Sequence, residues 1–282
     1  MLKQRVITAL VLLALLLPAL FAASPWPFMG LTVVLIAAGA WEWGRLNGMP
    51  LGLTWAGVLI SLLACLAAEQ SGWVQHTPPL VWLFAGAFWV LLGAWMVHRG
   101  VSAWSLWPRG LRWWGGVCLL VLAWLALAQA HQRGVNFLLS ILVLVWAADV
   151  FAYFFGKAFG GRWIKTKLAA RISPGKSWEG AFGGMLGVFL VAAAWLQIDQ
   201  RWTLDSLSFY SLLFAKGWFV ALPALLFMSA MSVVGDLVES LVKRSAGMKD
   251  SSGLLPGHGG VLDRVDALLP ALPLAMMLVF WI

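Results

Sequence analysis

Long apolar runs separated by short polar segments fill the chain from end to end. Because about 20 helical residues cross the hydrocarbon core of a bilayer, each run predicts a membrane-spanning helix. The predicted helices cover residues 6–24, 28–44, 52–68, 79–97, 113–130, 135–156, 178–197, 217–241 and 261–281. The pattern therefore predicts an all-α, polytopic membrane bundle of about nine transmembrane helices.

The composition agrees with this fold class. Of 282 residues, 62% are hydrophobic and only 11% are charged, with a mean hydropathy of +0.89, which excludes an ordinary soluble domain. The first apolar run follows Lys3 and Arg5, as in a secretory signal peptide. We interpret it as a retained span, because its removal would disturb the charge distribution between the two membrane faces. Cys65 and Cys118 lie in different apolar runs, which favours packing roles over a disulfide or metal site.

Basic residues collect on one side of the predicted bundle. If the N-terminus is cytoplasmic, 16 of the 19 lysines and arginines lie on the cytoplasmic face. Only Arg133, Arg201 and Lys216 remain on the other face. The positive-inside rule therefore predicts a cytoplasmic N-terminus and, with nine spans, a C-terminus outside.

Acidic residues concentrate in the C-terminal half of the chain. Of the 11 acidic residues, seven lie in the last four predicted helices or in the loops on their cytoplasmic side: Asp149, Glu179, Asp236, Glu239, Asp250, Asp263 and Asp266. Spacings of three and four residues place Asp236, Glu239 and Lys243 on one helix face, and Asp263 and Asp266 repeat the three-residue spacing. Two acidic faces are thus expected at helix ends joined by one loop.

Two neighbouring carboxylate pairs repel each other unless a cation lies between them. Mg²⁺ suits such a place, since it prefers carboxylate oxygens and leaves coordination positions open for substrate phosphates. The alternative is a buried salt-bridge network, in which Lys243, Arg244 and Arg264 neutralise these carboxylates. The residues alone leave both interpretations open.

The loop between the two acidic faces, GLLPGHGG, is rich in glycine around His258. Glycine permits unusual backbone angles and lets amide N–H groups approach an anion closely. The helix that begins after Gly260 also favours negative charge at its N-terminal end. Together these features predict a phosphate-binding segment.

The same region resembles the C-terminal signature of the phosphatidate cytidylyltransferase (CDP-diacylglycerol synthase) family. The matching pattern is S-x2-K-R-x4-K-D-x5-P-x-H-G-G-x2-D-R-x-D, from Ser240 to Asp266. Its polar members are Ser240, Lys243, Arg244, Lys249, Asp250, His258, Asp263, Arg264 and Asp266. So many fixed polar positions in a polar-poor chain make the resemblance specific.

A second stretch, residues 148–180, resembles the preceding conserved region of that family. The positions that match are Asp149, Tyr153, Gly156, Gly160, Ser173, Pro174, Lys176, Glu179 and Gly180. Lys157 stands where arginine is expected and Ser177 where threonine is usual, and both exchanges keep the charge or the hydroxyl. Residues 1–134 resemble the family only in hydropathy, so we assign them to a scaffold and residues 135–282 to the catalytic region.

The segment PGKS, ending at Ser177, looks like part of a phosphate-binding P-loop. A Walker A loop needs glycine where this chain has Ala170, and it follows a strand, which the sequence does not predict here. We therefore expect Lys176 to contact phosphate from a loop at the membrane surface rather than from a P-loop.

The resemblance implies that CTP and phosphatidic acid react to give CDP-diacylglycerol and pyrophosphate. It implies Mg²⁺, with a second cation as an option, held by Asp236, Asp263 and Asp266. The catalytic set would add Lys249, Asp250, His258 and Arg264. Asp250 and Glu239 would be weaker candidates for the metal, with the orientation of lysines as their alternative role. The substrate-binding set would comprise Asp149, Tyr153, Ser173, Lys176, Ser177, Glu179, Ser240, Lys243, Arg244, Gly259 and Gly260.

The expected setting is the cytoplasmic (inner) membrane of a bacterium, with the site on the cytoplasmic side, bilayer lipid around it, a homodimer as the family-level assembly and no nucleic-acid partner. Two other classes remain. A CTP-dependent lipid kinase would use similar carboxylates and lysines but would release CDP. A cation transporter would use intramembrane Asp149 and Asp236 as an ion path, but the acidic residues gather at one face rather than crossing the membrane.

Overall fold

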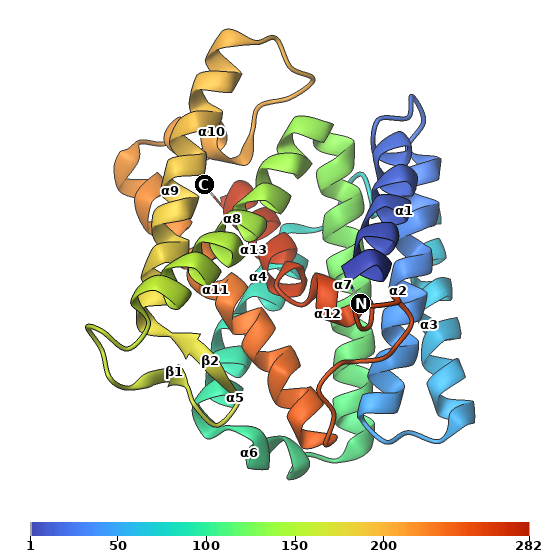
Figure 1. Cartoon of the computed structure of the whole chain (residues 1–282). Helices are drawn as coiled ribbons and strands as arrows, with labels where there is room; N and C mark the ends of the chain where they lie inside the picture. Colours follow the sequence, from blue (N-terminus) through green and yellow to red (C-terminus); the bar gives the residue numbers. More distant parts are fainter. Residues whose placement is uncertain (1, 282) are drawn as a thin grey trace.

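The computed structural model describes residues 2–281 as a bundle built almost entirely of helices (Figure 1). Seven long helices are continuous: α1 (Leu2–Leu20), α2 (Trp26–Leu46), α3 (Leu51–Gln70), α7 (Arg109–Arg133), α8 (Val135–Phe159), α9 (Trp178–Arg201) and α11 (Trp218–Ser245). Two further spans are composite, made of α4 (Pro79–Ala87), η1 (Phe88–Gly93) and α5 (Ala94–Arg99), and of α12 (Leu262–Val265) and α13 (Leu268–Trp281). Within these residues, nine segments are long and apolar enough to cross a membrane, which confirms the predicted bundle.

Helix ends differ from the predicted bounds by a few residues. The first helix ends at Leu20 rather than residue 24, because the approach to Pro25 disfavours helical backbone. α11 continues to Ser245, four residues beyond the predicted end, so that Lys243 and Arg244 form its last turn. Basic side chains are favourable in that position, since they complement the helix dipole.

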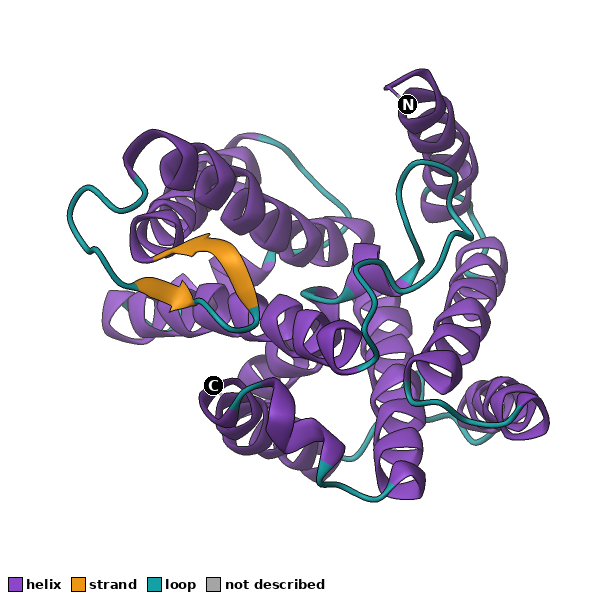
Figure 2. Ribbon diagram, turned by 60° about the horizontal axis from the view of Figure 1, so that its bottom comes forward, coloured by secondary structure: helices purple, strands orange, loops and turns teal. Residues whose placement is uncertain are grey.

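Four short elements were not predicted. They are α6 (Val101–Ser105), α10 (Phe209–Phe214) and the antiparallel strands β1 (Lys167–Ala169) and β2 (Ser173–Ser177). The two strands form a hairpin that leads directly into α9. Figure 2 shows this hairpin on the same face of the bundle as the loop between α11 and α12.

α8 and α9 pack so closely that glycine is required at the contact. A Cβ atom added to Gly183 would lie 2.3 Å from Phe155, and one added to Gly187 would lie 2.4 Å from Phe151. One added to Gly184 would lie 2.7 Å from the carbonyl oxygen of Ala148. Small residues at such contacts let membrane helices approach closely. This contact fixes the hairpin, which precedes α9, against the end of α8.

The last span packs against α11 in the centre of the bundle (Figure 1). A Cβ atom on Gly235 of α11 would lie only 2.6 Å from the backbone carbonyl oxygen of Asp266. The close approach brings Asp266, at the break between α12 and α13, beside the neighbouring residue Asp236. The fold therefore joins residues 30 positions apart in the sequence.

Topology can be tested by labelling single cysteines with a membrane-impermeant maleimide. We expect Gly175→Cys and Leu254→Cys to react only from the cytoplasmic side, and Leu204→Cys, at the opposite end of α9, only from outside. The background replaces Cys65 and Cys118 with serine; Leu254 and Leu204 are 47% and 41% exposed. The division of basic residues between the faces is the physical reason. Labelling of Gly175→Cys from outside intact cells would overturn this orientation.

Candidate active site

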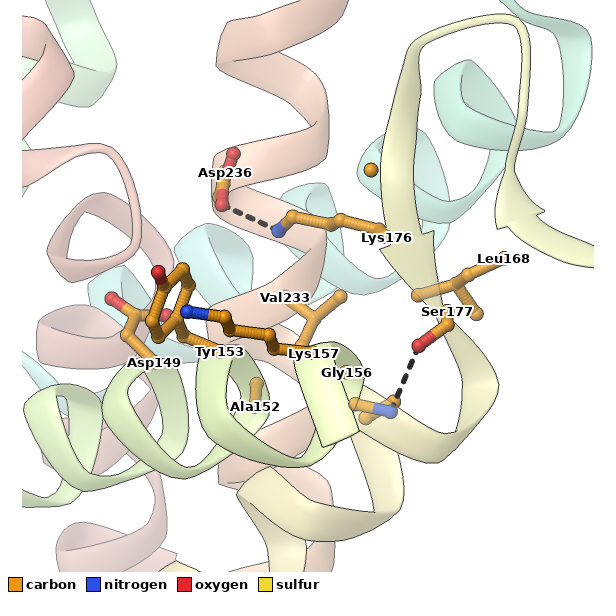
Figure 3. A pocket seen from close by; sticks show the side chains of 13 residues that line it. Asp149, Ala152, Tyr153, Gly156, Lys157, Leu168, Lys176, Ser177, Val233 and Asp236 are labelled. Carbon is orange, nitrogen blue, oxygen red and sulfur yellow. Dashed lines mark hydrogen bonds and ion pairs between the residues drawn. The ribbon is translucent and has the colours of Figure 1, made fainter. Parts of the chain in front are cut away.

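A pocket of about 470 Å³, with charged side chains in a mainly apolar lining, opens between α8, the β-hairpin, α9 and α11 (Figure 3). Asp149, Tyr153 and Lys157 enter it from one face of α8, because they are spaced four residues apart. Figure 3 shows these three side chains together, with the Lys157 ammonium 5.9 Å from the centre of the Tyr153 ring. The pocket thus receives a carboxylate, a phenol and an ammonium from a single helix.

Lys176 extends from β2 across the pocket to form an ion pair with Asp236 of α11 (Figure 3). The prediction that Lys176 lies in a loop was wrong, because residues 173–177 are extended and pair with β1. A strand does precede the PGKS segment, but the segment itself forms the second strand of the hairpin instead of wrapping an anion. Ser177 caps α9, its hydroxyl accepting the Gly180 amide at 3.1 Å.

Glu179 is fully buried and organises the loop that precedes the hairpin. Its Oε1 atom accepts the amide hydrogens of Gly161, Trp163 and Ile164 at 3.1, 3.0 and 2.9 Å. The pocket lining does not include Glu179. Within the described residues its contacts therefore hold the loop in place, while the predicted contact with substrate stays a prediction.

On α11 the charged side chains divide between two neighbouring clusters. Ser240 donates to Asp236 at 3.2 Å, on the side of the helix that faces the pocket. Further along the same face of α11, the Lys243 ammonium lies 2.5 Å from a carboxylate oxygen of Glu239 and from one of Asp263. The salt-bridge interpretation of the acidic faces therefore applies to Lys243, Glu239 and Asp263.

Asp263 is surrounded by hydrogen-bond donors. One carboxylate oxygen binds Lys243, and the other accepts the Ser251 amide and hydroxyl, each at 2.8 Å, and the Gly260 amide at 2.7 Å. The Gly260 amide, which was predicted to bind phosphate, is thus used by Asp263. Gly259 has a φ angle of +85°, a conformation that favours glycine.

The remaining signature residues lie around this loop. The Arg264 guanidinium donates to the carbonyl oxygen of His258 at 2.6 and 3.1 Å, and Arg244 donates to that of Met248 at 3.4 Å. Lys249 and Asp250 are exposed, and Ser173 is half-buried at the start of β2. None of Arg264, Lys249 and Asp250 is among the residues lining the pocket.

Asp149, Asp236 and Asp266 form a third group, close enough for their negative charges to repel one another. Across residues 2–281, no three carboxylate, imidazole or thiol side chains are arranged as a complete metal site. Mg²⁺, however, commonly takes one or two carboxylates and completes its shell with water and substrate phosphates. Asp266, and Asp236, whose oxygens contact only Ser240 and Lys176, suit such a partial site better than Asp263. The oxygens of Asp263 already hold Lys243 and three donors from Ser251 and Gly260.

Two residues outside the predicted site sets belong to this region. Lys157 lines the pocket, and its four-residue spacing from Tyr153 was the sequence signal for it. Glu42 of α2 is fully buried and contacts the loop between α11 and α12. The sequence signal for Glu42 is an acidic residue inside an apolar run, 28–44, in the part of the chain that the sequence assigns to the scaffold.

Comparison with known proteins agrees with this architecture. The model of the cytidylyltransferase family matches residues 3–282. A phosphatidate cytidylyltransferase from Pseudomonas aeruginosa is 37% identical over 283 residues, covering 97% of this chain and 95% of the relative. Proteins of the same name from Haemophilus influenzae and Brucella abortus are 34% and 35% identical; the first match covers both chains completely, and the second covers 96% of this chain and 90% of the relative. The chain therefore belongs to the cytidylyltransferase family.

Proposed function

We propose that the protein transfers the cytidylyl group of CTP to phosphatidate, giving CDP-diacylglycerol and pyrophosphate in the pocket between α8, β2 and α11. The observation that carries this proposal is the meeting of Lys176, Asp236 and the polar face of α8 at the end of membrane-spanning helices. The names of the full-length relatives support the same reaction. A transferase in this position can reach a lipid phosphate in the bilayer and a hydrated nucleotide above it.

The chemistry requires that two anionic substrates be held close together. A phosphatidate oxygen forms a bond to the α-phosphorus of CTP, and the bond from that phosphorus to the departing pyrophosphate breaks. Lys157 and Lys176 would offset the charge of the phosphates in the pocket. A phosphomonoester has a second pKa of about 6 and is largely ionised near neutral pH, so no general base is required.

Asp236 and Asp266 would hold Mg²⁺, which would neutralise phosphate charge and stabilise the attacking and departing oxygens. Asp149 would contribute a third negative charge from α8. Asp263 and Lys243 would shape the floor of the site through their ion pair rather than by contact with the metal. Lys249, on the loop after α11, and Arg264, in α12, would meet the triphosphate as it enters.

The two substrates require that the pocket be open both to water, for CTP, and to the apolar surface of the bundle, for the lipid. On α8, Tyr153 faces the pocket, and the adjacent Phe154 is 62% exposed on the apolar surface of the bundle. Acyl chains that remain among the helices and lipids would not need to leave the bilayer. The headgroup phosphate would then enter from the side while CTP enters from the aqueous face.

We also propose that the protein resides in the cytoplasmic membrane of a bacterium, with this pocket facing the cytosol. The bacterial relatives and the distribution of basic residues support that placement. CTP is supplied on that side of the membrane. Assembly as a homodimer stays a prediction.

Replacement of the proposed metal-binding carboxylates should reduce turnover. Asp236→Asn and Asp266→Asn should each lower kcat by about a hundredfold and raise the Mg²⁺ concentration needed for half-maximal activity. Glu69→Gln, a carboxylate change at the far end of α3, is the control and should leave both values unchanged. Steady-state assays of purified protein, titrated with MgCl₂, measure the effect.

Loss of turnover without a change in Mg²⁺ dependence would argue against a metal role for that residue. Wild-type turnover in either variant would remove it from the site. Comparable amounts of assembled protein, measured in the membrane fraction before purification, are required for every variant.

Isotopic label in CTP separates the proposed reaction from a lipid kinase. With phosphatidate as acceptor, label in the α-phosphate should enter the lipid and label in the γ-phosphate should leave as pyrophosphate. A kinase would place the γ-label on a lipid and leave the α-label in CDP. Thin-layer chromatography of the lipid and aqueous phases distinguishes them, and γ-label in lipid without pyrophosphate would refute the proposal.

A further inference from the structure

Glu42 is a fully buried carboxylate on the second helix of an apolar bundle. An ionisable side chain in such a place is unfavourable unless donors surround it. Its partners come from the loop between α11 and α12, more than 200 residues away in the sequence. A buried acid with such distant partners joins two parts of the fold.

Each carboxylate oxygen of Glu42 accepts two hydrogen bonds. Oε1 accepts the Ser252 hydroxyl at 2.5 Å and the Val261 amide at 2.9 Å. Oε2 accepts the Ser251 hydroxyl at 3.2 Å and the Leu262 amide at 2.8 Å. Two donors precede the glycine-rich loop and two follow it, so the side chain closes the loop at its base.

The arrangement is specific for a carboxylate. A glutamine side chain has one acceptor oxygen and an NH₂ group that only donates, so in either orientation one of the two backbone amides, Val261 or Leu262, would face another donor. A buried donor without an acceptor costs about 1–3 kcal/mol. Glutamine has nearly the same size as glutamate, and the substitution therefore tests hydrogen bonding rather than packing.

A second carboxylate reinforces the same closure. Asp263 accepts from the Ser251 and Gly260 amides, and it shares the single hydrogen of the Ser251 hydroxyl with Glu42, at 2.8 Å from Asp263 and 3.2 Å from Glu42. A Cβ atom on Gly260 would lie 2.0 Å from the Ser251 hydroxyl and 2.3 Å from Glu42 Oε1. The close approach of these two side chains therefore explains why residue 260 is glycine, and a bound phosphate is not needed to explain it.

We infer that Glu42 is a positioning residue for the catalytic carboxylates, acting through the start of α12. It binds the amide of Leu262, and the carbonyl oxygen of Leu262 in turn accepts the Asp266 amide at 3.0 Å. The Val261 amide is held in the same way, and its carbonyl accepts the Arg264 amide at 2.9 Å. Glu42 thereby sets the direction in which Asp266 leaves the backbone toward Asp236.

The inference rests on the proposed function, because it assigns Asp266 to the reacting site. It does not place Glu42 in contact with substrate. A displacement of about 1 Å at reacting groups can cost on the order of a hundredfold in rate. Loss of the Glu42 hydrogen bonds should therefore lower turnover more than it weakens substrate binding. Lys157 and Lys176, which are proposed to bind the phosphates, lie on other elements.

The test compares Glu42→Gln, Glu42→Asp and Ser252→Ala in the full chain. We expect Glu42→Gln to lower kcat by about ten- to a hundredfold, while the KM values for CTP and phosphatidate change by less than about threefold. Glu42→Asp, which keeps the carboxylate, should recover part of the lost kcat. Ser252→Ala removes one donor and should cost less than Glu42→Gln, with no further loss in the double variant.

Hydrogen exchange followed by mass spectrometry gives a readout independent of activity. Exchange in peptides covering residues 251–262 should accelerate in Glu42→Gln and not in peptides from α8. The matched control is Thr32→Val, which changes a buried α2 side chain bonded only to Phe28 and Met29 of its own helix. That control should leave both kcat and loop exchange at wild-type values.

Wild-type kcat and wild-type loop exchange in Glu42→Gln would overturn the inference. So would a fall in kcat without faster exchange at 251–262, or an equal effect of Thr32→Val. If Glu42→Gln fails to assemble, Glu42→Asp and Ser252→Ala must still show faster loop exchange than Thr32→Val. If the wild-type protein makes no CDP-diacylglycerol, the proposed function fails. The exchange measurements still test whether Glu42 holds residues 251–262 in place.

Discussion

A carboxylate inside an apolar bundle needs hydrogen-bond donors, and this requirement organises one face of the protein. Glu42, Glu179 and Asp263 each obtain donors from loop amides or hydroxyls. Their partners lie in the loop before the hairpin, in the loop between α11 and α12 and at the start of α12, so these buried acids give irregular segments a defined shape. Asp149, Asp236 and Asp266 differ, because they lie close enough to repel one another and have fewer donors, with Asp236 paired to Lys176.

Close helix contacts supply the second part of the arrangement. Glycines in α9 let α8 approach, and Gly235 in α11 lets the backbone at Asp266 approach. The contact at Gly235 brings Asp266 beside Asp236, and the contact between α8 and α9 positions the hairpin that carries Lys176. The pocket is therefore located where small residues permit three helices and a hairpin to converge, and the polar side chains occupy the space left between them.

The sequence predicted the fold well because each span is a long apolar run, which needs no knowledge of tertiary contacts. It did not predict the β-hairpin, since strands of three and five residues in a polar stretch carry no clear alternation. The carboxylates of the signature were found from spacing and resemblance, but spacing does not reveal which ones are already satisfied. Asp263 and Gly260 show this, because the contacts of both depend on Ser251 and Glu42, and the role of Glu42 depends on partners 209 to 220 residues away.

The distance in sequence between Glu42 and its donors has a consequence for biosynthesis. A ribosome adding 5–20 residues per second needs about 10 to 40 s to extend the chain from Glu42 to the loop. During that time the second helix carries a carboxylate whose four eventual donors have not been made. Water or another hydrogen-bond donor must stabilise it until the last span is inserted. A chain that ends before residue 251 would keep this carboxylate without the donors that it has in the finished protein.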